Sequence, residues 1–302
     1  DMLHTELLEN TINILDDKLT DNSNIDLNKE SAEQDSIRKL YPEISNEEIT
    51  AHYKLLPDQY FQNNSKLDVG LHLKMINRLL KHISLSDSED SLIPIIEWHD
   101  DVDLSMSIVH IVTWDRAGLF YKLAGAFSVA GLNILSSKAI SREDHILIDT
   151  FYVCEPNGGI VQNKDIKLKF EKCLKEILIQ DKDLMPSIRN QGKKYIKSPY
   201  LKNKKKLELS LPSSINVYHE TSLQKTIIEI NTIDQIGLLY RIAKKIFEYG
   251  FDITFARIST EGDIAIDTFY IEYTNQDHPR DTAYLLGLRE SLNNTISLGI
   301  KK

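Results

Sequence analysis

A short stretch of this chain occurs twice, and no other feature limits the possible fold as strongly. Residues 114–121 read WDRAGLFY and residues 233–240 read IDQIGLLY. Each copy follows an apolar run rich in β-branched residues and precedes an apolar-periodic run that ends at a glycine. Such an internal repeat predicts two copies of one structural unit. The residues that recur 119 positions later are Asp115 and Asp234, Gly118 and Gly237, Leu119 and Leu238, Tyr121 and Tyr240, Ala124 and Ala243, Gly131 and Gly250, and Ile134 and Ile253.

Both copies predict the same order of elements, which is strand, helix, strand, strand, helix. Residues 105–113 are apolar on both faces, a pattern typical of a strand at the centre of its sheet. Gly131 follows the first helix, where a left-handed glycine cap is expected. In the first copy we expect the elements at Ser105–Thr113, Gly118–Ala130, Asn133–Ser141, Ile146–Cys154 and Lys164–Ile179. In the second copy we expect them at Gln224–Asn231, Gly237–Tyr249, Asp252–Thr260, Ile264–Tyr273 and Pro279–Ser297.

The residues before the first copy have a helical pattern. Apolar residues at helical spacing predict a helix over residues 2–19, and the polar residues 20–36 indicate a loop. Ser45, followed by two glutamates, predicts a helix start, and Pro57 stops or kinks that helix. A further helix is expected over Val69–Ile83.

The segment between the copies predicts an added hairpin or edge strand, formed by Leu207–Leu211 and Ile215–His219 around Pro212. This completes the predicted division of the chain. We expect a helical amino-terminal region at 1–92, a first repeat unit at 93–185, a linker at 186–221 and a second repeat unit at 222–302.

Composition restricts the class of protein further. A formal net charge of −9 weighs against a nucleic-acid binder, because neutralising phosphates requires a basic face. The lysine-rich segment 193–206 is the local exception, and we interpret it as a solvated linker rather than an anion or RNA site. The apolar runs are too short for a membrane span, and no signal peptide is evident. Two cysteines fit a reducing compartment, so a cytoplasmic protein is expected.

The repeated unit resembles the ACT domain, a ferredoxin-like regulatory module that usually binds a small amino acid. The resemblance rests on Asp-x-x-Gly-Leu at the start of the first helix and Gly-Leu-Asn-Ile, residues 131–134, at the second strand. The tandem, with the segment DHILIDTF at residues 144–151, resembles the carboxy-terminal region of the bifunctional PII uridylyltransferase/uridylyl-removing enzymes. The segments LPDQYF at 56–61 and DVGLHL at 68–73 are similar to the same family, so the resemblance covers about residues 40–297.

This resemblance implies an α+β protein with two ferredoxin-like βαββα(β) ACT domains in tandem, preceded by a small α-helical region. It implies a module for allosteric regulation of nitrogen metabolism that senses an amino acid, with glutamine as the expected ligand. The PII protein would be a partner through the parent enzyme. A homo-oligomer formed through the ACT sheets or helices is also expected.

The catalytic parts of that family are missing from the sequence. A nucleotidyltransferase needs a Gly-Ser element and paired metal-binding aspartates, and a phosphohydrolase needs a distributed set of His and Asp ligands. The pair His99-Asp100 is interpreted as an ordinary linker pair. We therefore predict no catalytic residue, no metal ligand and no cofactor in this chain, since Mg or Mn would belong to the absent catalytic domains. The chain thus resembles the sensory end of the enzyme or a paralogue that lacks the catalytic head.

The repeated loop is the candidate ligand site. Gly118 lies where a strand ends and a helix begins, so backbone N–H groups and the helix dipole favour a carboxylate there. Asp115 can accept from an ammonium group, and Asn133 offers an amide suited to a glutamine side chain. The second copy has Asp252 at the position of Asn133, which weakens the case for an equivalent glutamine contact. The predicted ligand-binding residues are Asp115, Ala117, Gly118, Leu119, Asn133, Ile134, Asp234, Ile236, Gly237, Leu238, Asp252 and Ile253.

Other interpretations remain open at this point. Asp115 and Gly118 can serve only as a helix cap and a tight turn. Asp149 and Asp267 each precede Thr-Phe in a strand, and the sequence suggests no role for them. The tandem can also be a dimerisation or interaction scaffold without a small ligand, or the chain can retain uridylyltransferase or uridylyl-removing activity.

Overall fold

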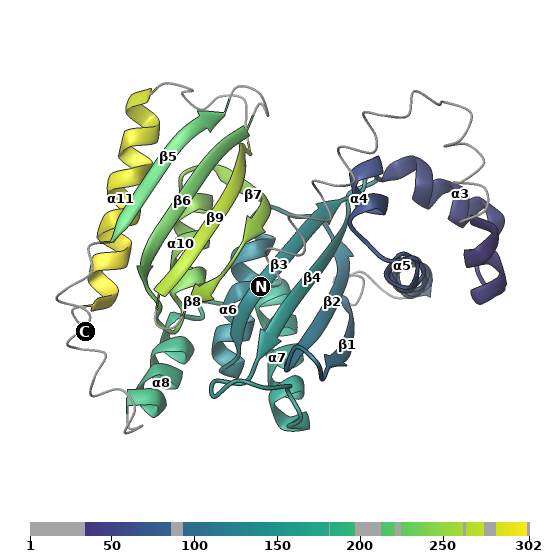
Figure 1. Cartoon of the computed structure of the whole chain (residues 1–302), viewed down its shortest axis with the longest axis horizontal. Coiled ribbons are helices and arrows are strands. Elements are labelled where there is room, and N and C mark those ends of the chain that lie inside the picture. The colour runs from purple at the N-terminus through teal and green to yellow at the C-terminus, as the bar shows by residue number, and fades with distance from the viewer. Residues whose placement is uncertain are drawn as a thin grey trace. The chain divides into compact units, whose positions relative to one another are not determined.

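The computed structural model describes residues 34–85, 93–180, 182–196, 213–220, 225–261, 264–274 and 282–300 (Figure 1). The predicted helix over residues 2–19, most of the lysine-rich segment and Leu207–Leu211 lie outside the described residues. The chain divides into two compact units, and the boundary between Lys74 and Met75 falls inside helix α5. None of the helices in the described part of the chain is long and apolar enough to cross a membrane.

The amino-terminal unit is helical, as predicted. Residues 34–40 form a helix, which replaces the end of the loop predicted over residues 20–36. It is followed by α3 (Asn46–Leu55), α4 (Asp58–Gln62) and α5 (Lys66–Leu85).

The predicted start and end of α3 are confirmed. The Ser45 Oγ accepts the backbone N–H of Glu48 at 3.2 Å, and the Glu48 carboxylate accepts the backbone N–H of Ser45 at 3.0 Å. This reciprocal capping box satisfies two N–H groups that a helix start leaves without an intrahelical partner. Leu56 has extended backbone angles, as expected for a residue that precedes a proline.

The second unit contains both copies of the repeat, each built on an antiparallel sheet. In the first sheet the strand order is β1-β2-β4-β3, and in the second it is β5-β6-β9-β7 with β8 paired to β9. The strands of the first sheet are β1 (Ile95–Asp101), β2 (Met106–Trp114), β3 (Asn133–Ser141) and β4 (Ile146–Cys154). Those of the second are β5 (Ser214–Glu220), β6 (Lys225–Ile233), β7 (Phe251–Arg257), β8 (Thr260–Glu261) and β9 (Ile264–Tyr273). This α+β architecture is compatible with two ferredoxin-like domains in tandem.

One edge strand of each sheet comes from the segment that precedes its copy. The prediction allowed a last strand after the second helix of each copy, whereas β1 and β5 both precede their copy and pair with its first strand. Ile215–His219 is therefore an edge strand, as predicted. The interpretation of His99-Asp100 as a linker pair is wrong, because both residues lie in β1. There the Asp100 carboxylate accepts the hydroxyl of Ser107 at 2.7 Å.

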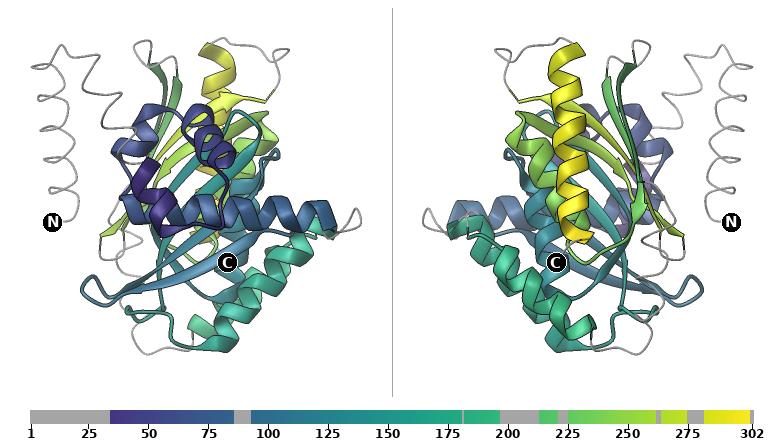
Figure 2. Two further views of the ribbon diagram at one scale, coloured as in Figure 1. Left: turned by 90° about the vertical axis from the view of Figure 1, so that its right-hand side faces the viewer. Right: turned by 90° about the vertical axis from the view of Figure 1, so that its left-hand side faces the viewer.

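The helices pack on one face of each sheet (Figures 1 and 2). In the first copy α6 and α7 pack together, and in the second α10 packs against α11, which also lies along β5. Buried side chains of these helices and the sheets form one continuous apolar core. The four helices occur at the predicted places, as α6 (Leu119–Ala130), α7 (Lys164–Gln180), α10 (Leu238–Glu248) and α11 (Thr282–Ile300). The predicted linker contains a helix that the sequence did not indicate, α8 (Met185–Ile196).

The two copies lie side by side within this unit. The edge strands β3 and β7 are neighbours, and α6 packs against α10. The ring of Tyr121 meets that of Tyr240 at 5.9 Å between centroids, so the repeated tyrosines contact each other across the junction. This pairing places the start of β7, from the second copy, next to the repeated loop of the first copy.

Candidate functional site

The two repeated loops have the same backbone geometry. Gly118 has φ 73° and ψ 14°, and Gly237 has φ 74° and ψ 12°, a left-handed conformation that glycine adopts without steric cost. In each loop the first residue of the helix donates its N–H three residues back, Leu119 to Arg116 at 3.1 Å and Leu238 to Gln235 at 2.9 Å. The Asp-x-x-Gly-Leu sequence therefore encodes one specific turn between strand and helix.

The loop of the first copy is completed by a residue of the second copy. The backbone N–H of Gly118 donates to Oδ1 of Asp252 at 2.9 Å, and Asp252 is the second residue of β7. The sequence predicts Asn133, the counterpart of Asp252, as the partner of this loop. The structure instead places Asn133 at the start of β3 with an exposed side chain. Asp252 takes the place expected for Asn133 because β3 and β7 are neighbours, which brings the second copy next to the first loop.

A cavity of about 460 Å³ opens at this junction. Its volume lies in the range of pockets that hold small molecules. The first copy contributes its loop, the end of β3 and the start of β4, and the second copy contributes the start of β7 and the end of β9. The lining includes Asp115, Arg116, Leu119, Phe120, Ser141, Asp149, Asp252, Ile253 and Glu272.

Carboxylates dominate the polar lining, and most of them already have partners. Asp115 accepts the hydroxyl of Ser141 at 2.7 Å, Asp252 accepts the N–H of Gly118, and Glu272 pairs with Lys225. Asp149 is different, because neither of its oxygens has a hydrogen-bond partner among the described residues. Its side chain is 1% exposed.

The surroundings of two of these carboxyl groups raise their pKa. Burial, and then the nearby Asp115 carboxylate, raise the pKa of Asp149 well above its ordinary value. Burial and Asp115 also raise the pKa of Asp252, although the N–H of Gly118 acts in the opposite direction.

Arg116 supplies the positive charge of the cavity lining. Its guanidinium donates to the Thr113 hydroxyl at 3.4 Å, and burial lowers its pKa from the ordinary value. A guanidinium can bind a carboxylate through two parallel hydrogen bonds. The cavity thus offers acceptors for a cationic group and a donor for an anionic one.

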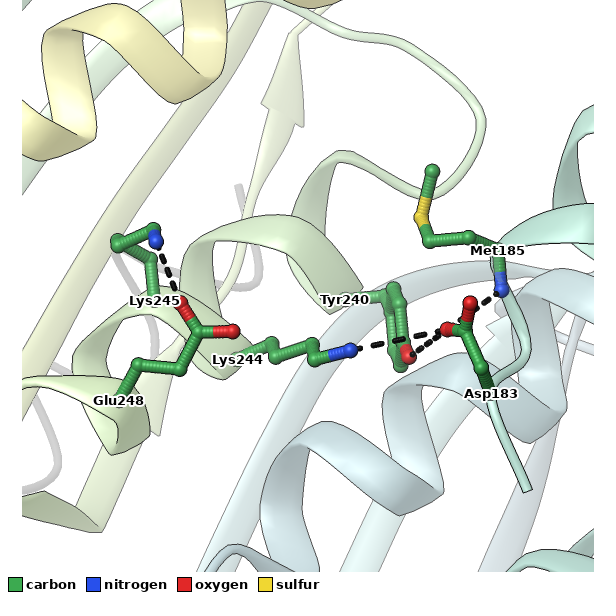
Figure 3. Close-up of polar contacts among 6 residues, drawn as sticks. All are labelled: Asp183, Met185, Tyr240, Lys244, Lys245 and Glu248. Atoms are coloured by element: carbon green, nitrogen blue, oxygen red, sulfur yellow. Dashed lines mark hydrogen bonds and ion pairs between the residues drawn. The ribbon is translucent and has the colours of Figure 1, made fainter.

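The loop of the second copy has different neighbours, which belong to α8 and the residues before it (Figure 3). Asp183 accepts the hydroxyl of Tyr240 at 3.3 Å and lies 3.6 Å from the ammonium of Lys244. A Cβ added to Gly237 would lie 2.4 Å from Cγ2 of Ile188, so α8 packs directly on this loop. The two loops, alike in conformation, are therefore not equivalent in their surroundings.

The structure brings together only part of the predicted ligand-binding set. Asp115, Leu119, Asp252 and Ile253 line the cavity, and Gly118 contacts it through its bond to Asp252. Eleven lining residues were not predicted, and three of them are charged, namely Arg116, Asp149 and Glu272. The remaining predicted residues lie elsewhere: Ala117 in the exposed part of the first loop, Asn133 and Ile134 at the start of β3, and Asp234, Ile236, Gly237 and Leu238 at the second loop.

Of the charged lining residues that were missed, only Asp149 had a signal in the sequence. Asp149-Thr150-Phe151-Tyr152 recurs in the second copy, and that repetition was the one sequence signal for Asp149. Within the described ranges, no group of three or more His, Cys, Asp or Glu side chains is arranged to hold a metal ion.

Comparison with known proteins identifies the relatives of the chain. No protein-family model matches it. The chain is 30% identical over 202 residues to the bifunctional uridylyltransferase/uridylyl-removing enzyme of Rhodospirillum rubrum, a match that covers 67% of this chain and 21% of that protein. This chain is related to part of the bifunctional uridylyltransferase/uridylyl-removing enzymes.

Other matches support the same relationship. The enzyme of the same name from Erythrobacter litoralis is 25% identical over 223 residues, covering 74% of this chain and 22% of that protein. The one from Psychrobacter sp. is 23% identical over 231 residues, covering 76% and 24%. The chain thus spans about a fifth of the length of these relatives, which is consistent with a carboxy-terminal region of such an enzyme.

Proposed function

We propose that this chain is an amino-acid-sensing regulatory module of a PII uridylyltransferase-like protein, and that its ligand is glutamine. The observation that carries the proposal is the cavity between the two copies, which combines carboxylates with a guanidinium. A free amino acid is a zwitterion, so it matches a site with both kinds of group. The relatives support the nitrogen-regulatory setting, and the catalytic activities would belong to parts of the protein outside this chain.

In this proposal Arg116 binds the ligand carboxylate. The sequence assigns that task to the backbone at Gly118, but the N–H of Gly118 is already engaged by Asp252. Arg116 lines the same cavity and is the natural partner for a carboxylate. The polar groups of Ser141 and Glu272 lie in the same lining and can meet the side-chain amide.

The regulatory effect would come from the two-copy construction of the cavity. A ligand that contacts the first-copy loop and β7 together stabilises one relative arrangement of the copies. Its effect on any attached catalytic domain is limited by the difference between its affinities for the two arrangements. Coupling free energies of this kind are typically about 1–3 kcal/mol.

Isothermal titration of the purified chain with glutamine tests the proposal, with Arg116→Gln as the matched variant. The second copy naturally has Gln235 at the position of Arg116, so this change introduces a side chain that the repeat already tolerates. We expect the parent to bind glutamine and the variant to bind about tenfold more weakly or worse, because a charge-assisted hydrogen bond is lost. A parent chain that does not bind glutamine at millimolar concentration contradicts the proposal.

The alternative function, an interaction scaffold, is favoured by the outward face of the second sheet. Tyr218 and Phe255 are exposed there, and the strand register places both in one row with Tyr270. A second copy of the chain that covers this row would make the module a dimer. Light scattering at micromolar concentration separates the two cases, since a monomer that binds glutamine excludes the scaffold function.

A further inference from the structure

We propose that Asp149 is the residue that binds the ligand's ammonium group, inside the cavity between the two copies. This inference rests on the proposed amino-acid site and adds a residue that the sequence left without a role. Other carboxylates in the lining could receive an ammonium group in principle. The geometry distinguishes Asp149 from each of them.

Each of the other carboxylates of the cavity has one oxygen engaged within the protein. Asp115 accepts the Ser141 hydroxyl, Asp252 accepts the Gly118 N–H, and Glu272 pairs with Lys225. Asp149 lines the cavity with two oxygens that have no partner in the described part of the chain. Among the lining carboxylates of the described residues, Asp149 is thus the one whose two oxygens are both buried without a partner, so it gains most from a donor.

The fold gives up stability to keep this group. Burying a polar group without a hydrogen bond costs about 1–3 kcal/mol, and an ionised carboxylate costs more. Asp149 sits on β4 between Ile111 of β2 and Ala139 of β3, and both of these neighbours are apolar. A ligand ammonium group would supply both the hydrogen bonds and the countercharge that this position lacks.

The counterpart in the second copy is already partly satisfied. Asp267 is equally buried, at 3% exposed, but the backbone N–H of Ser259 bonds to its carboxyl group. Asp267 is also not part of the cavity lining. The pair provides an internal comparison for the binding test. If a buried aspartate at this strand position served only the structure, replacing Asp149 and replacing Asp267 would have the same effect on ligand affinity.

Ammonium binding at Asp149 should release a proton. The charged groups that share the cavity lining with Asp149 are Asp115, Arg116, Asp252 and Glu272, and burial together with the Asp115 carboxylate favours the protonated form of Asp149. A bound ammonium group would reverse this balance and favour the carboxylate. Titration in buffers of different ionisation enthalpy measures the released proton.

The test compares two ligands on three proteins, using the whole chain. Glutaramic acid is glutamine without its α-amino group, so it retains the carboxylate and the amide. The proteins are the parent, Asp149→Asn and Asp267→Asn. We expect the parent to bind glutamine at least tenfold more tightly than glutaramic acid, and Asp149→Asn to lose about ten- to hundredfold in glutamine affinity together with the proton release. Asp267→Asn should bind glutamine like the parent.

Each other outcome has a distinct meaning. If the parent binds glutamine and glutaramic acid equally, the ammonium contact does not exist, and this result requires no variant to fold. If Asp149→Asn weakens both ligands by the same factor, Asp149 is structural and the inference is overturned while glutamine sensing stands. If the parent binds no glutamine but binds another amino acid through Asp149, glutamine sensing fails and the inference stands. If the parent binds no ammonium compound among the common amino acids, both fail.

Discussion

The buried carboxyl of Asp267 makes the stability of the second copy depend on pH in a direction that can be calculated. Burial, and then the neighbouring Asp234, raise the pKa of Asp267 from 3.8 to about 8. Between these values the folded chain holds a proton that the unfolded chain has released. The free energy of unfolding therefore contains a contribution that is present below pH 4 and is lost as the pH rises towards 8. Each pH unit in this window removes about 1.4 kcal/mol.

Replacing Asp267 by Asn removes this dependence. The amide is nearly the same size, and its oxygen can still accept the N–H of Ser259. The free energy of unfolding of the variant should therefore rise relative to that of the parent by about 1.4 kcal/mol per pH unit. The total difference should reach roughly 5 kcal/mol at pH 8. This is a large effect beside the stability of about 5–15 kcal/mol that is typical of a folded protein.

Urea denaturation at pH 5, 6, 7 and 8, followed by circular dichroism, measures the difference between the two proteins. Glu143→Gln removes an exposed carboxylate from the turn between β3 and β4, and it controls for the loss of one charge. The slope with pH is the decisive quantity, because the substitution itself can shift both curves by a constant. Parallel curves for parent and Asp267→Asn would show that the reasoning from burial is wrong.

Further changes test the junction of the copies and the amino-terminal unit. Gly125→Ala should lower the free energy of unfolding by about 1–3 kcal/mol in urea denaturation, because the added Cβ would lie 2.7 Å from both Leu184 and Tyr240. Gly192→Ala is its matched control in α8, where an added Cβ meets nothing within 4 Å, and it should raise stability by about 0.5–1 kcal/mol. Ser45→Ala should destabilise the amino-terminal unit by about 1 kcal/mol through loss of the capping box, measured by hydrogen exchange in α3, and unchanged exchange there would contradict the capping argument.

The repeat made most of the second unit predictable. A glycine that must adopt a positive φ, preceded by an apolar strand and followed by an apolar-periodic helix, leaves few alternatives for the local structure. Gly131 has the predicted left-handed conformation, Gly118 adopts one as well, and the helix between them lies where the pattern placed it. The predicted hairpin of β3 and β4 is also confirmed.

Two elements were missed because their local signals are weak. Strand β1 starts with two isoleucines but continues with charged residues, as an edge strand that is partly exposed can do. Helix α8 leads into the lysine-rich segment, and its few apolar residues gave no clear period. Its contact with Gly237 depends on packing between distant segments, which no local pattern contains.

The candidate site was predictable only as a loop. A sequence repeat indicates two similar units but not how they pair, and the pairing decides which residues meet. Gly118 and Asp252 are separated by 134 residues, so their hydrogen bond could not be inferred from either copy alone. The sequence therefore predicted a site within each copy, with the first copy favoured, whereas the structure forms its cavity from both.

A cavity lined by residues of both copies has a consequence for how such a chain can evolve. In a symmetric dimer of single modules, every substitution alters two identical sites at once. Covalent duplication removes that constraint, since Asp252 can change without changing Asn133, and α8 can settle on one loop while the other stays open. The first-copy loop can then evolve towards ligand recognition, while the second-copy loop, which α8 covers, can evolve a different role.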